Sequence, residues 1–161
     1  MMVLDLAESL KDWATETLES IGVYKAKASK FEEYQQKLIE DLKKTYSEAA
    51  LRLFFNRTDM RSLPSPDRFA KVTGPCGDTM KIYLRVENGG ITNACFETDG
   101  CMNSIMSGAM VTQLAKGKSL NEARQIDQDT ILKALDGLPS ESTHCALLAA
   151  DTLKEAIKDT V

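Results

Sequence analysis

The amino-acid sequence predicts an α+β fold, with a small antiparallel three-stranded sheet covered by helices and an added N-terminal helical region. Apolar and polar residues alternate from Met80 to Val86, which is typical of a strand with one buried face. Segments with helical periodicity lie on both sides of this β-like region, before Asn56 and after Gly100. A run of strands followed by several helices indicates an α+β domain, because the two element types are separated along the chain.

Three strands are expected in one antiparallel sheet. Arg68–Val72 predicts a short first strand, and Met80–Val86 predicts the second. The segment Glu87–Gly90 contains Asn-Gly-Gly, whose residues tolerate positive φ, so a hairpin turn is expected there. Ile91–Thr98 then returns as the antiparallel partner strand.

Capping and breaking residues mark the helices that follow the sheet. A helix is expected over residues 102–116. Ser119 and Glu122 have the spacing of a capping box, which predicts a short helix after them. Asp129 is expected to cap the next helix, and a last helix is expected to begin around Thr143.

The first 57 residues predict helix, interrupted at Gly22. One apolar stripe precedes Gly22, and a second follows it at three- and four-residue steps. The first consists of Val3, Leu6, Leu10, Trp13, Thr17 and Ile21, and the second of Tyr24, Ala28, Phe31, Leu38, Leu42 and Ala49. The stripes indicate a helical hairpin or a partner-binding arm, or else faces that pack on each other or on the main domain.

Composition limits the class of protein. The chain has 161 residues, 43% of them hydrophobic and 27% charged, as expected for one globular domain or one domain with an appendage. Its net charge of -4 argues against nucleic-acid binding through a global basic field. No apolar run approaches the ~20 residues of a membrane span, and the N-terminus lacks a secretory or transit pattern. We therefore expect a cytoplasmic protein with reduced cysteines.

Three cysteines lie in loop-like settings beside turn residues or other metal ligands. Cys76 and Asp78 share the turn Gly-Pro-Cys-Gly-Asp, Cys101 follows Asp-Gly, and Cys145 follows His144. Cys101 and Cys145 are expected at or near helix starts, where the helix dipole favours the thiolate that binds metal or attacks sulfur. Three thiolates with an oxygen or nitrogen ligand indicate a metal or iron–sulfur site in which the one ligand that is not a thiolate exchanges easily.

Alternative interpretations apply to single residues. Cys95 lies in the middle of a predicted strand without a neighbouring ligand, so it is interpreted as a small buried hydrophobe. Asp78 could cap a turn, and His144 could be a hydrogen-bonded residue at a helix start. A cysteine hydrolase is disfavoured because the only histidine is adjacent in sequence to Cys145 and no third orienting residue is evident.

These motifs resemble the IscU/NifU-type iron–sulfur cluster assembly scaffolds. The resemblance covers residues 46–161 and leaves residues 1–45 as a helical N-terminal extension. The matching segments are Tyr46-Ser47-Glu48, Asn56-Arg57, Gly74-Pro75-Cys76-Gly77-Asp78, Thr98-Asp99-Gly100-Cys101 with Ser104-Ile105 and Ser107-Gly108, Lys116-Gly117-Lys118, and His144-Cys145-Ala146 with Leu148-Ala149.

The resemblance implies a non-enzymatic scaffold for de novo assembly of a labile [2Fe-2S] cluster. Cys76, Cys101 and Cys145 would be the cluster thiolates, Asp78 the ligand that keeps the cluster labile, and His144 an alternative ligand. A cysteine desulfurase would deliver persulfide sulfur to Cys145, which is preferred, or to Cys76. Iron and electron donors would complete the cluster, apo iron–sulfur client proteins would receive it, and Zn²⁺ could occupy the same residues.

Two departures and one alternative accompany the resemblance. Residues 138–142 read Leu-Pro-Ser-Glu-Ser where many members have Leu-Pro-Pro-Val-Lys, which makes recognition by an Hsp70-type chaperone doubtful. Residues 1–45 are additional, and we expect them to support homo-oligomerisation or desulfurase docking. The alternative is a SufU-like, zinc-dependent sulfur acceptor that activates a cysteine desulfurase. His144 favours the scaffold over this alternative, because the SufU-like branch is associated with a cysteine at the position that His144 occupies in this chain.

Overall fold

The computed structural model describes residues 25–158, with side chains from Phe31 onward. The expected first apolar stripe and the break at Gly22 lie outside these residues. The chain divides into two compact units with the boundary between Thr45 and Tyr46, and each is described by itself. Among the described helices, none combines the length and the apolar character needed to cross a membrane.

The first unit contributes helix α2 (Lys25–Thr45), which ends earlier than the sequence pattern indicated. The expected stripe continued to Ala49, but a separate helix α3 (Glu48–Phe55) begins after Ser47. The Ser47 side chain accepts a hydrogen bond from the Ala50 N–H at 3.0 Å and so caps α3. The expectation of one continuous helix was wrong, because the spacing of apolar residues alone does not reveal that a serine caps a new helix.

The sheet has three antiparallel strands, as predicted, and the structure shows that they form a meander. Its strands β1 (Arg68–Thr73), β2 (Thr79–Glu87) and β3 (Gly90–Thr98) pair in the order β1-β2-β3. Asn88 and Gly89 connect β2 to β3 with φ of 51° and 77°, which confirms the predicted hairpin turn. The sequence thus predicted the sheet within a few residues at each strand end.

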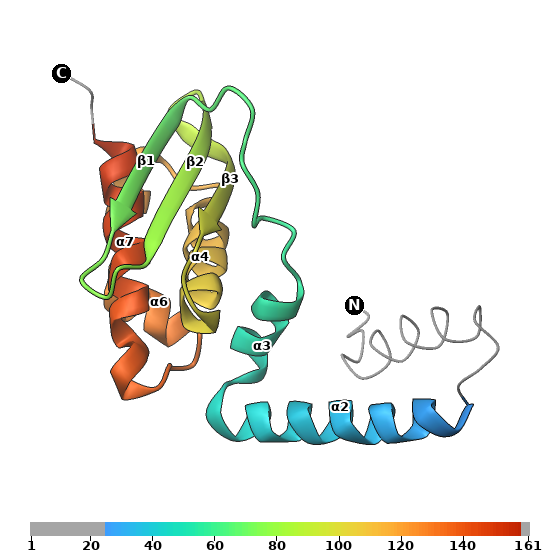
Figure 1. Cartoon of the computed structure of the whole chain (residues 1–161). Helices are drawn as coiled ribbons and strands as arrows, with labels where there is room; N and C mark the ends of the chain where they lie inside the picture. Colours follow the sequence, from blue (N-terminus) through green and yellow to red (C-terminus); the bar gives the residue numbers. More distant parts are fainter. Residues whose placement is uncertain (1–24, 159–161) are drawn as a thin grey trace. The chain divides into compact units, whose positions relative to one another are not determined.

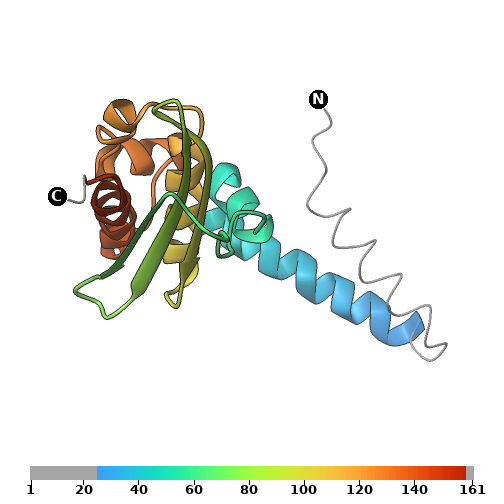
Figure 2. The same cartoon turned by 90° about the horizontal axis from the view of Figure 1, so that it is seen from above.

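Two helices cover one face of the sheet. Helices α4 (Met102–Ala115) and α7 (Thr143–Ile157) lie side by side behind the strands, with α7 against β1 and β2 and α4 against β3 (Figures 1 and 2). Alternate residues of β2 point into this layer. Met80, Ile82 and Leu84 are completely buried there, as the period-two pattern predicted.

Short helices connect α4 to α7. Helix α5 (Leu120–Ala123) begins with the predicted capping box of Ser119 and Glu122. Helix α6 (Gln128–Ala134) is capped by Asp127, whose side chain accepts from the Thr130 N–H at 2.8 Å. The predicted cap at Asp129 was wrong, since Asp129 lies inside the first turn. A 3₁₀ turn, η1 (Ser140–Ser142), leads directly into α7.

Candidate metal centre

Three segments that are distant in sequence meet at one end of the sheet. They are the β1–β2 loop, the connection from β3 to α4, and the first turn of α7. The antiparallel register places the start of β2 beside the end of β3, with Met80 opposite Thr98. The two helices behind the sheet both begin near this end, so their N-termini face the same site.

The β1–β2 loop is a compact turn held by its own backbone. The Gly74 N–H donates to the Asp78 carbonyl at 2.8 Å, and the Gly77 N–H donates to the Gly74 carbonyl at 3.0 Å. Gly77 has a φ of 89°, a conformation that side-chain-bearing residues rarely adopt. Cys76 is exposed on this turn, and Asp78 is partly buried at its base.

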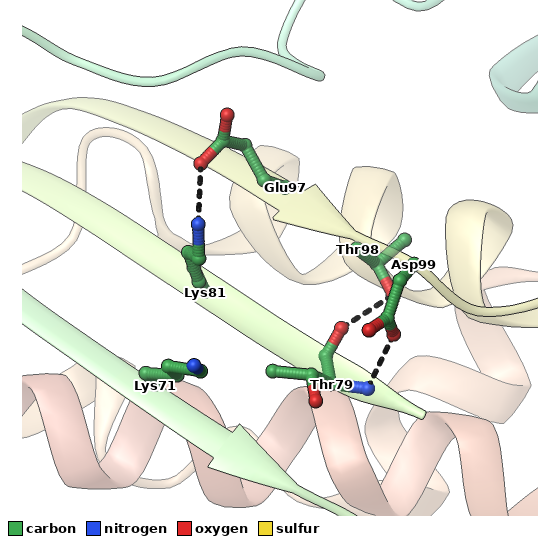
Figure 3. A pocket seen from close by; sticks show the side chains of 6 residues that line it. All are labelled: Lys71, Thr79, Lys81, Glu97, Thr98 and Asp99. Atoms are coloured by element: carbon green, nitrogen blue, oxygen red, sulfur yellow. Dashed lines mark hydrogen bonds and ion pairs between the residues drawn. The ribbon is translucent and has the colours of Figure 1, made fainter. Parts of the chain in front are cut away.

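Hydrogen bonds fasten the base of the loop to the end of β3, as Figure 3 shows for Thr79, Thr98 and Asp99. The Thr79 N–H donates to Asp99 Oδ1 at 2.6 Å, and the Thr98 hydroxyl donates to the Thr79 carbonyl at 2.8 Å. Beyond these contacts, on the sheet, an open hollow is lined also by Lys71, Lys81 and Glu97. The contacts fix the backbone between the aspartate of the loop and the cysteine that starts α4.

Asp78, Cys101 and Cys145 form a cluster of potential metal ligands. One ligand atom from each residue, two sulfurs and a carboxylate oxygen, lies within 4.8 Å of the others. Cys145 is completely buried, whereas Cys101 is exposed. Thiolate and carboxylate groups at this separation are ligands that Zn²⁺ and iron accept, so the residues present fit such a metal or cluster.

The two cysteines of the cluster differ in their acidity. Burial opposes ionisation of Cys101, but the backbone N–H groups of Ser104 and Asn103 favour its thiolate, and its pKa lies below the ordinary value. Burial raises the pKa of Cys145 to about 11, although the Ser104 hydroxyl acts in the opposite direction. The expected preference for the thiolate agrees with the direction of the pKa shift at Cys101 and disagrees with that at Cys145, where desolvation outweighs the position near the helix start.

Two residues of the predicted site lie outside this cluster. Cys76 is two residues from Asp78 but exposed, and its sulfur is not part of the group. His144 precedes Cys145 at the start of α7, is exposed, and is likewise not part of the group. Cys95 is completely buried in β3, and burial is the largest influence raising its pKa, in agreement with its interpretation as a small hydrophobe.

Sequence reasoning did not identify Ser104 as part of the site. Its hydroxyl oxygen lies 2.8 Å from Asp78 Oδ2, 3.4 Å from Cys145 Sγ and 4.0 Å from Cys101 Sγ, all within hydrogen-bond reach. The available signal was its spacing three residues after Cys101, which places the two side chains on neighbouring positions of one helix face. Ser104 is completely buried, so its partners are all within the protein.

The fold and the site define a class of protein: an α+β domain with a thiol–carboxylate cluster able to hold a metal at one end of its sheet. The chain belongs to the family described as the NifU-like N terminal domain, which it matches over residues 45–160. This match confirms the resemblance drawn from the cysteine motifs, and it leaves most of the first unit outside the matched region.

Relatives with related names share much of the matched region. The chain is 39% identical over 115 residues to "Iron-sulfur cluster assembly scaffold protein IscU 1" of Archaeoglobus fulgidus, covering 71% of this chain and 75% of that relative. It is 48% identical over 85 residues to the IscU scaffold protein of Buchnera aphidicola from Acyrthosiphon pisum, covering 52% of this chain and 66% of the relative.

Solved structures share the fold. A crystal structure from Fervidobacterium islandicum, named for an iron–sulfur cluster assembly scaffold of the SUF system, superposes with a TM-score of 0.60 at 21% identity, covering 70% of this chain and 96% of the other. A NifU-like N-terminal protein from Brucella abortus gives a TM-score of 0.53 at 22% identity, covering 69% and 90%. At these identities the likeness supports the fold alone.

Proposed function

We propose that this protein is a scaffold on which a labile [2Fe-2S] cluster is assembled and from which it is passed to apoproteins. The observation that carries the proposal is the convergence of Asp78, Cys101 and Cys145 within 4.8 Å. The chain's family supports the same function, since relatives 39–48% identical are named as iron–sulfur cluster assembly scaffolds. The cluster is cargo, so the protein acts as a carrier and not as an enzyme.

The candidate ligands have different roles in holding the cluster. Cys101 and Cys145 supply two thiolates, and Asp78 supplies a hard oxygen ligand that soft iron–sulfide units bind less firmly. Cys76 supplies the third thiolate from the exposed turn, which must move for its sulfur to join the other ligands. His144, next to Cys145, serves as an alternative ligand to Asp78. A cluster with one weakly bound ligand is suited to transfer to another protein.

Sulfur is proposed to arrive as a persulfide on a cysteine desulfurase. A scaffold thiolate attacks the outer sulfur, the sulfur–sulfur bond of the donor breaks, and the desulfurase cysteine leaves as a thiolate. Cys145 and Cys76 are the candidate acceptors. Cys145 is buried with a raised pKa in the metal-free protein, whereas Cys76 is exposed, so accessibility favours Cys76 for the first transfer. Iron and an electron donor complete the cluster.

Anaerobic reconstitution tests the proposal. The full chain is incubated with ferrous iron, cysteine and a cysteine desulfurase, and absorption and Mössbauer spectra are recorded. We expect a [2Fe-2S] spectrum in the native protein and its loss in Cys101→Ser, while Cys95→Ala, a buried cysteine outside the site, retains it. A full cluster spectrum in Cys101→Ser would contradict the ligand assignment.

A zinc-dependent sulfur acceptor is the second candidate function. It is favoured by one observation: two sulfurs and one oxygen from described residues lie within 4.8 Å of one another, and three protein ligands are the number found in zinc sites with one open position. This function predicts that the Zn²⁺-loaded protein stimulates desulfurase turnover without forming a cluster. Turnover measured with and without iron separates the two functions.

We further propose that residues 1–45 form a partner-binding extension of the domain at residues 46–161, in a cytoplasmic protein. Helix α2 exposes large apolar side chains, with Phe31 45%, Tyr34 67% and Leu38 49% exposed. Such a stripe at helical spacing is suited to a second helix, from another copy of the chain or from the desulfurase. If a chain lacking residues 1–45 kept the same oligomeric mass and desulfurase affinity, this assignment would be wrong.

A further inference from the structure

A single buried hydroxyl joins the three ligands of the candidate metal centre. Ser104 Oγ lies 2.8 Å from Asp78 Oδ2, 3.4 Å from Cys145 Sγ and 4.0 Å from Cys101 Sγ. These partners come from the β1–β2 loop, the first turn of α7 and the start of α4. Ser104 is completely buried in α4, so no contact with solvent competes with them.

Gly100 leaves room for this hydroxyl because it has no side chain. A Cβ atom built on Gly100 would lie 2.4 Å from Asp78 Oδ2 and 2.6 Å from Ser104 Oγ. Real Cβ atoms essentially never approach other atoms within 3.0 Å, so any side chain at this position would separate the pair. The backbone before Cys101 is therefore compatible with the hydroxyl–carboxylate contact only when residue 100 lacks a side chain.

We propose that Ser104 is a positioning residue that orders the ligands before a metal or cluster arrives, an inference that rests on the proposed function. The hydroxyl has one proton to donate, and the shorter contact directs it to Asp78 Oδ2. This bond holds the carboxylate beside the two sulfurs, where it can serve as a ligand. Partners that orient metal ligands in this way typically contribute about 10- to 100-fold to metal affinity.

A neighbouring serine provides a matched control. Ser107 lies one turn further along α4 and is also completely buried, but its hydroxyl has no hydrogen-bond partner among the described residues. Ser107→Ala and Ser104→Ala therefore remove the same atom from the same buried helix. Only Ser104→Ala removes a contact with the candidate ligands.

The experiment titrates the full-length metal-free chain with Co²⁺, whose absorption bands report thiolate coordination and geometry. We expect Ser104→Ala to weaken Co²⁺ binding about tenfold or more and to shift the visible bands, by loss of an orienting partner. Ser104→Thr, which retains a hydroxyl, should restore much of the native spectrum. Ser107→Ala should bind Co²⁺ as the native chain does.

The outcomes separate this inference from the proposed function. Native binding and native bands in Ser104→Ala would overturn the role of Ser104 while leaving the metal centre intact. Absence of Co²⁺ binding by the native chain would overturn the metal centre itself, and the inference with it. Should Ser104→Ala fail to fold, Gly100→Ala decides, because it displaces the same contact while keeping the hydroxyl: unchanged Co²⁺ affinity and bands would refute the positioning role.

Discussion

Cys101 and Cys145 direct their sulfur atoms into one site, yet their pKa values are shifted in opposite directions. The pKa of Cys101 is lowered, despite burial, by the N–H groups at the start of α4, whereas burial raises that of Cys145 to about 11. Two neighbouring thiolates would repel each other, and retaining one proton avoids that cost. Cys101 is thus the more acidic thiol of the metal-free site, and the buried Cys145 keeps its proton to a higher pH.

This difference predicts selective alkylation of the metal-free protein. Iodoacetamide should modify the exposed Cys76 and Cys101 and spare the buried Cys95 and Cys145. Modification of Cys101 should become fast at a lower pH than that of an ordinary cysteine, since the pKa of Cys101 lies below the ordinary value. Peptide mass spectrometry at a series of pH values measures each site. Equal rates at Cys101 and Cys145 would contradict the assigned environments.

The affinity for Zn²⁺ should depend on pH through Cys145. Metal binding must displace the proton of this thiol, so the apparent affinity should rise by up to about tenfold per pH unit for that one proton until pH approaches 11. A competitive chelator titration between pH 6.5 and 9 measures the slope, with the protonation of the chelator itself accounted for. The variant Cys145→Ala should bind less tightly and with a smaller slope; an unchanged slope would exclude Cys145 as the source of the proton.

Asp78→Ala should slow loss of an assembled cluster. The carboxylate is the hard ligand among soft thiolates, so it is the corner at which a chelator enters most easily. Decay of the visible absorption under chelator challenge measures the rate, with Asp129→Ala, which removes an exposed carboxylate on α6 outside the ligand group, as the comparison. Equal or faster decay in Asp78→Ala would show that the oxygen ligand is not the origin of lability.

Gly108→Ala should destabilise the fold without touching a ligand. The added Cβ would lie 2.4 Å from the ring of Phe96, which is 1% exposed and has no free space into which to move. Overpacking of this kind costs about 1–3 kcal/mol of unfolding free energy. Urea denaturation measures the loss. Gly90→Ala is the control, since its Cβ would meet only ordinary contacts from 3.6 Å outward, and a similar loss there would argue against the steric explanation.

Local features explain why most of the fold was predictable. The strand alternation at Met80–Val86 and the Asn88-Gly89 turn depend on neighbours within a few residues, so their signals survive in the sequence. The first residues of the helices were harder to predict, because the residue that caps a helix depends on the conformation of the preceding loop. Asp127 caps α6 in place of Asp129, and Ser47 divides a stripe that appeared continuous.

The sequence by itself determined the family, the three antiparallel strands, and the cysteines and aspartate that carry the proposed chemistry. These follow from local periodicity and from motifs that each occupy a few residues. Tertiary structure alone decided that Asp78, Cys101 and Cys145 meet while Cys76 and His144 stay outside the cluster. It also decided the burial that raises the pKa of Cys145 and the central place of Ser104, because burial and contacts between distant segments exist only once the sheet and helices have packed.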